Sequence, residues 1–101
     1  MTQASFYQRL RSAMESGSLT PSDLARWFDR PYSTVSKWLA EQREPWGPNG
    51  ERAYHQLTRL EQLIRKRRGF PIPVDLSPTD RVTHLEGVKR DAGVLELDPP
   101  R

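Results

Sequence analysis

The sequence contains no cysteine among its 101 residues, which excludes disulfide bonds and thiolate metal ligation and fits a reducing compartment. Long hydrophobic runs are also lacking. The first residues carry no basic segment and lead into no apolar stretch, so we expect neither a signal peptide nor a transmembrane helix. Only 35% of the residues are hydrophobic, which predicts one modest core with extensions around it.

Recognisable catalytic patterns are absent as well. The sequence has no glycine-rich phosphate loop and no nucleophile elbow. The two histidines, His55 and His84, have no partner at the spacing of a metal site, and Glu86 and Asp91 form no catalytic set with His84. We therefore expect no enzymatic activity, no metal and no cofactor.

Charge is distributed unevenly along the chain. Residues 1–48 hold six Lys or Arg and five Asp or Glu, residues 49–74 hold six and two, and residues 75–101 hold four and six. The basic middle segment favours a polyanionic partner, whereas the acidic last segment argues against contact with a polyanion there.

Apolar residues at helical spacing predict an all-α protein. Thr20 is a good N-cap, Pro21 suits a first helical position, and Asp23 places an acid beside the helix N-terminus. The predicted helices of the main bundle cover residues 4–16, 21–28, 32–42 and 51–68. We expect these four helices to form one domain over residues 1–69.

Residues 70–101 are predicted to follow this bundle as a separate part. Alternating prolines make residues 70–74 an extended arm, a short acidic helix reaches from residue 78 to 91, and residues 93–101 form a loose tail or a short strand. A core of four helices does not require this part. We expect it to dock on the protein's own core, on a second subunit or on a different protein partner.

Residues 20–43 carry the pattern with the clearest function. Ala25 is small enough for two helices to cross closely, Val35 and Trp38 can hold the second helix from beneath, and the run from Ser33 to Leu39 reads STVSKWL. These residues resemble the helix-turn-helix of phage and bacterial repressors. The resemblance implies a DNA-binding domain whose second helix lies in the major groove.

Two positions differ from the family's usual pattern. The family has glycine at the position of Asp29, since the chain often turns there through a left-handed conformation, which aspartate tolerates better than most residues. Pro31 at the start of the second helix is also unusual, although proline is acceptable in a first helical turn.

The resemblance also implies which residues contact DNA. The residues expected to read bases or flanking phosphates are Tyr32, Ser33, Ser36 and Lys37, and those expected to bind the phosphate backbone are Arg30, Thr34 and Arg43. The basic run Arg65, Lys66, Arg67 and Arg68 is either a further phosphate-binding patch or a charged helix end of the kind that the helix dipole favours. Trp46 is either an exposed contact or, as we expect, folded back over the core.

Oligomerisation would add a second DNA contact to a helix that reads only a few base pairs, so we expect a homo-oligomer, with a dimer favoured. The stripe of Leu57, Leu60 and Ile64 either closes the core or forms a self-association seam. A small head with an extended arm is also similar in layout to small terminase subunits and other phage accessory proteins.

The expected function is sequence-specific binding of duplex DNA, with regulation of transcription as the leading role. One alternative is a DNA-recognition subunit of phage packaging or recombination machinery. An alternative of another class is an assembly or adaptor module that binds proteins. The leading function predicts a cytoplasmic, nucleoid-associated protein with no membrane contact.

Overall fold

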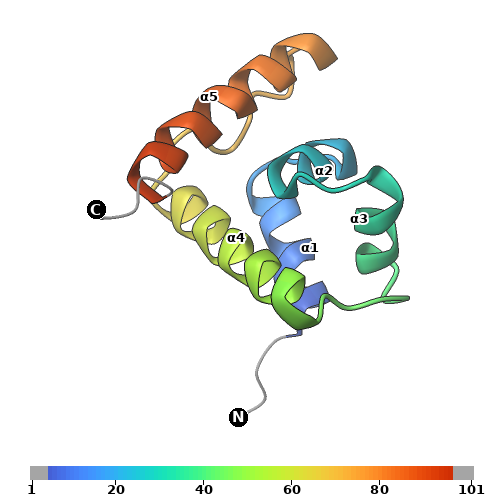
Figure 1. Ribbon diagram of the computed structural model, residues 1–101. Helices are drawn as coiled ribbons and strands as arrows, with labels where there is room; N and C mark the ends of the chain where they lie inside the picture. Colours follow the sequence, from blue (N-terminus) through green and yellow to red (C-terminus); the bar gives the residue numbers. More distant parts are fainter. Residues whose placement is uncertain (1–4, 97–101) are drawn as a thin grey trace.

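The computed structural model describes residues 5–96, except for the side chains of residues 49 and 92–96. This part of the chain forms five helices and no strand (Figure 1). The helices are α1 (Phe6–Ser16), α2 (Pro21–Phe28), α3 (Tyr32–Leu39), α4 (Gly47–Arg65) and α5 (Pro78–Glu96). The prediction of an all-α protein is therefore confirmed.

The predicted start of α2 is confirmed in detail. The Thr20 hydroxyl accepts a hydrogen bond from the backbone N–H of Asp23 at 3.1 Å, and the Asp23 carboxylate accepts one from the N–H of Thr20 at 2.9 Å. Pro21 occupies the first turn, where its missing N–H costs no helical hydrogen bond. These reciprocal bonds satisfy two N–H groups that would otherwise lack partners at the helix end.

Several predicted boundaries are wrong, among them the end of α4, which lies at Arg65 rather than at Arg68. Helix α4 begins at Gly47 rather than Glu51, because Pro48 belongs to its first turn instead of to a loop. Helix α3 ends at Leu39, before the left-handed Glu41, rather than at Gln42. Helix α5 is 19 residues long, so residues 93–96, which were expected in a tail or strand, are helical. Residues 97–101 of that predicted tail lie outside the described residues.

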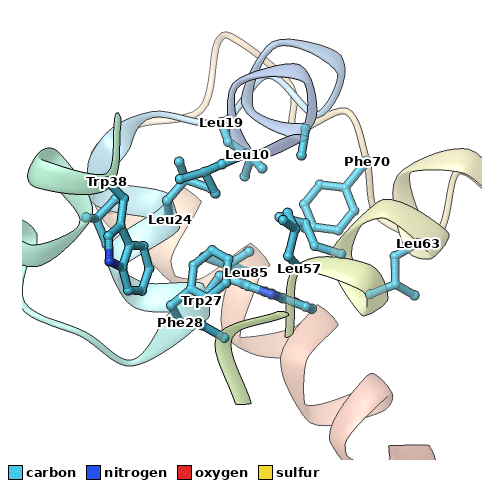
Figure 2. Packing of buried hydrophobic residues seen from close by; sticks show 14 of the residues in the cluster. Leu10, Leu19, Leu24, Trp27, Phe28, Trp38, Leu57, Leu63, Phe70 and Leu85 are labelled. Atoms are coloured by element: carbon cyan, nitrogen blue, oxygen red, sulfur yellow. The ribbon is translucent and has the colours of Figure 1, made fainter. Parts of the chain in front are cut away.

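The core is formed by apolar side chains from all five helices and from the segment between α4 and α5. Figure 2 shows Trp38 reaching from α3 towards Leu24 and Phe28. Leu57 and Leu60 are fully buried, which confirms that their stripe closes the core. The buried members are Phe6, Leu10, Ala13, Leu19, Leu24, Trp27, Phe28, Val35, Trp38, Ala53, Leu57, Leu60, Leu63, Phe70, Ile72 and Leu85.

The segment after α4 is part of this core, so the prediction that the core does not require it is wrong. Phe70, Ile72 and Leu85 are buried among side chains of the first four helices, and the Ile72 N–H donates to the carbonyl of Gly17 at 2.9 Å. The prolines keep residues 70–74 out of a helix but leave Phe70 and Ile72 able to face inward. Of the three expected docking partners, the protein's own core is the one that the structure shows.

Helix α5 contacts both ends of α2. Arg81 pairs with the buried Asp23, with 3.2 Å between its Nε and the carboxylate, and also donates to the carbonyl of Ser18 at 2.7 Å. Farther along α5, the Lys89 ammonium donates to the carbonyl of Arg26 at 2.8 Å. Burial alone would raise the pKa of Asp23, but hydrogen bonds from Arg81 and the Thr20 N–H outweigh it and lower that pKa.

Candidate nucleic-acid interface

The connection between α2 and α3 is three residues long and tightly turned. Asp29 adopts a left-handed conformation with φ 55° and ψ 49°, and the Arg30 N–H donates to the carbonyl of Ala25 at 3.0 Å. The Pro31 carbonyl then accepts from Thr34 and Val35, which begins α3. The left-handed turn therefore falls at Asp29, a residue type that enters this region more readily than most.

Two side chains hold α3 against the core. Val35 is fully buried and Trp38 is 4% exposed. The Trp38 ring meets the Phe6 and Phe28 rings edge-on, with centroid distances of 5.3 Å and 5.4 Å. Since Val35 and Trp38 are three positions apart, they lie on one side of α3 and leave its opposite side to solvent.

The exposed side of α3 consists of small hydroxyls, one phenol and one ammonium group. Tyr32, Ser33, Ser36 and Lys37 are exposed, whereas Thr34 is half-buried beside Trp38. Each exposed side chain offers a hydrogen-bond donor, and the three hydroxyls also accept. This side of α3 can therefore bind polar edges with mixed donors and acceptors, but it carries only one charge.

Two predicted backbone-binding residues join α3 in a single hollow. Arg30 lies in the turn before α3 and Arg43 lies in the loop after it, and both line a hollow of about 310 Å³. Its other lining residues are Thr34, Trp38, Glu44, Pro45, Trp46, Pro48 and Gly50. The structure thus brings together all three residues that were expected to bind the phosphate backbone.

Trp46 is 78% exposed, so the prediction that it folds back over the core is wrong. Trp27 and Trp38 are buried, and Trp46 has an extended backbone at the start of α4. Four residues on, Gly50 lies against the Pro45 backbone, because a Cβ there would come within 2.7 Å of the Pro45 carbonyl carbon.

The basic run from Arg65 to Arg68 lies elsewhere. All four side chains are exposed, at the C-terminal end of α4 and just beyond it. Figure 1 places this end of α4 across the molecule from α3 and close to the C-terminal half of α5. Lys66 and Arg68 line a separate cleft of about 530 Å³ together with Val88 and Asp91 of α5. The structure does not bring this run to the exposed side of α3.

Helix α5 contributes basic residues that the sequence-based prediction did not include. A hollow of about 810 Å³ beside the turn is lined by Ala25, Arg26, Asp29, Arg30, Pro31, Glu86, Lys89 and Arg90. Burial lowers the pKa of Lys89, and nearby Arg26 adds to the effect, although Asp29 acts in the opposite direction. The sequence-based prediction omitted Lys89 and Arg90 because residues 75–101 are acidic overall. The one sequence feature that could have indicated them is that these two basic residues are adjacent.

The described part of the chain shows neither a metal site nor a membrane-spanning helix. The side chains described between residues 5 and 91 include no group of three or more His, Asp or Glu that could hold a metal ion. No helix in this range is long and apolar enough to cross a bilayer. No protein-family model, curated protein or solved structure matches this chain. Its own residues and their geometry therefore carry the functional proposal.

Proposed function

We propose that this protein binds duplex DNA through α2 and α3 and regulates transcription. The observation that supports this most is the arrangement of α3, which Val35 and Trp38 hold from beneath while its donor-bearing side faces solvent. A short helix presented in this way fits the major groove, where base edges offer patterned donors and acceptors.

The proposed roles follow from the chemistry of each side chain. Lys37 donates to guanine, while Ser33 and Ser36 bind either donors or acceptors on base edges. Tyr32, at the first turn of α3, contacts a phosphate or a thymine methyl group. These contacts set the preferred sequence, and the arginines beside α3 set the position on the duplex.

Positive charge on two sides of α3 supports the same proposal. Arg43 follows the helix, and Lys89 and Arg90 of α5 lie beside the turn that precedes it. Cations in these places attract duplex DNA without regard to its sequence. A straight duplex centred on α3 lies away from the run at Arg65–Arg68, which under this proposal is a charged helix end rather than a contact.

Lys37→Ala should weaken duplex binding about tenfold, because one donor to a base edge is worth about 1–3 kcal/mol. Lys66→Ala is a matched control, since it removes the same exposed ammonium group from the distant basic run. Fluorescence anisotropy with a labelled duplex, measured across a salt series, would report both variants. If Lys66→Ala lost affinity and Lys37→Ala did not, DNA would bind at the basic run Arg65–Arg68 and the proposed binding through α3 would be wrong.

Selection of bound sequences from a random duplex pool, with stoichiometry measured on the same sample, tests the role. A palindromic site bound by a dimer supports a transcription regulator, because a two-fold protein matches a two-fold site. A ring of more than two subunits on DNA supports a packaging subunit instead. Failure to retain any duplex at low salt would reject DNA binding and favour the adaptor alternative.

A further inference from the structure

We propose that Trp46 is a second DNA contact, which packs against the sugar-phosphate backbone of one strand beside the groove that α3 enters. The inference rests on the proposed function, since it assigns a further part of the same interface. The surface concerned, here called the Trp46 surface, consists of Arg30, Thr34, Arg43 and Trp46, which line one hollow.

The exposure of Trp46 requires an explanation that core packing does not give. Tryptophan is highly buried on average, and the other two in this chain are each only 4% exposed. The Gly50 N–H donates to the Trp46 carbonyl at 2.9 Å, which fixes the backbone of Trp46 on the first turn of α4. The indole is therefore presented to solvent from a defined backbone.

The position of the Trp46 surface on α3 suits a strand that borders the groove. At 100° per residue, Thr34 lies between the buried Trp38 and the exposed Lys37 around the helix. The surface therefore adjoins the exposed side of α3 along one flank. A duplex that receives Lys37 in its major groove has one phosphate backbone along such a flank.

The chemistry of the surface fits a sugar-phosphate backbone. Arginine pairs with phosphate oxygens, a threonine hydroxyl donates to them, and the indole offers an apolar face for deoxyribose with an N–H at its edge. Glu44 is the acidic residue in the lining, and the hydroxyl of Tyr54 donates to its carboxylate at 3.1 Å. The two arginines therefore leave the lining with a net positive charge.

A protein partner fits this surface less well. Among the described side chains, which end at residue 91, the exposed large hydrophobic ones are Tyr32, Trp46 and Val74, and of these only Trp46 lines the hollow. The lining also includes Pro45 and Pro48, so apolar area alone does not decide between a protein and DNA. Charge complementarity instead favours a polyanion.

Acrylamide quenching of tryptophan fluorescence tests the contact directly. Trp46 is 78% exposed and the other two tryptophans are 4% exposed, so Trp46 should dominate the quenching, and Trp46→Phe identifies its signal by removing it. A duplex obtained by the selection described above, added at saturating concentration, should protect Trp46 from quenching. Unchanged quenching with the duplex bound would overturn the inference and leave the proposed function intact.

Affinity measurements supply the second test. Trp46→Ala should weaken binding of the same duplex severalfold, because it removes the apolar area that the indole buries against deoxyribose. Arg43→Ala should reduce the slope of log K against log salt by about one, the effect of losing one phosphate contact. Val74→Ala, which removes apolar surface from an 85% exposed side chain elsewhere, should change neither quantity.

The outcomes separate the two proposals. Full affinity in both Trp46→Ala and Arg43→Ala, with Lys37→Ala impaired, would remove the Trp46 surface and keep DNA binding through α3. Absence of duplex binding by the unmodified protein would overturn both. Thermal unfolding of each variant checks that the exposed substitutions leave the fold unchanged.

Discussion

Replacing Arg81 with methionine should lower the free energy of unfolding by about 3 kcal/mol at pH 7, since removing one partner of a buried ion pair leaves the other charge uncompensated. Asp23 is 5% exposed, and Arg81 supplies both its Nε and a second guanidinium nitrogen to the same carboxylate. The substitution also removes the donor to the carbonyl of Ser18. Urea denaturation followed by circular dichroism would measure the loss.

Arg11→Met is the matched control for this prediction. Arg11 pairs with Glu15 one turn away on α1, but both side chains are more than half exposed and their closest atoms are 3.8 Å apart. Exposed pairs of this kind contribute little to stability because water and salt screen them. Equal destabilisation by both substitutions would show that the Asp23–Arg81 pair is not special.

The pH dependence of the Arg81→Met effect follows from the lowered pKa of Asp23. A carboxyl whose folded pKa lies below its unfolded value of about 3.9 stabilises the protein above that value and loses this contribution as the pH falls through the folded pKa. The stability gap between wild type and Arg81→Met should therefore be full at pH 7 and narrow below about pH 4. A gap that stays constant down to pH 2 would contradict the ion-pair explanation.

Phe70→Ala should lower the free energy of unfolding by about 3–5 kcal/mol, the usual cost of deleting a buried aromatic side chain. Phe70 is 3% exposed and meets Trp27 nearly edge-on, with ring centroids 6.3 Å apart. The side chain thus fills space between α2 and the segment after α4. Because fluorescence would combine Trp27, Trp38 and Trp46, circular dichroism during denaturant unfolding would show whether the whole core is weakened.

Val74→Ala provides the comparison for Phe70→Ala within the same segment. Val74 is 85% exposed, so shortening it should leave the unfolding transition almost unchanged. If residues 70–74 were a separate arm, both substitutions would leave the unfolding of α2 unaffected. A large effect of Phe70→Ala alone would show that the segment unfolds together with the first four helices.

The parts of the fold that the sequence predicts well depend on residues close together in the chain. Thr20, Pro21 and Asp23 begin α2 through contacts across three residues, so their types alone identify the helix start. The inward-facing Val35 and Trp38 follow from helical spacing in the same way. The orientation of α3 was therefore predictable, while the DNA contacts on its exposed side remain predictions.

The parts that were not predictable depend on contacts between distant residues. Phe70 is buried because the chain after α4 returns to α2, and no local pattern indicates that return. Trp46 is 78% exposed whereas Trp27 and Trp38 are buried, a difference that spacing along the chain does not reveal. Charge counts along the chain likewise do not show where basic residues lie in the fold. The run at Arg65–Arg68 lies across the molecule from α3, whereas Lys89 and Arg90 lie beside the turn before α3.

The link between α5 and α2 also bears on how the protein folds during synthesis. Asp23 pairs with Arg81, which is translated 58 residues later. The carbonyl of Arg26 accepts a hydrogen bond from Lys89, which is translated 63 residues later. The two helices proposed to contact DNA thus leave the ribosome well before the residues that stabilise them are made. Contacts between residues so far apart in sequence form slowly. A nascent chain that ends before α5 should therefore hold α2 and α3 only loosely, and the two helices should reach their final arrangement only after α5 is made.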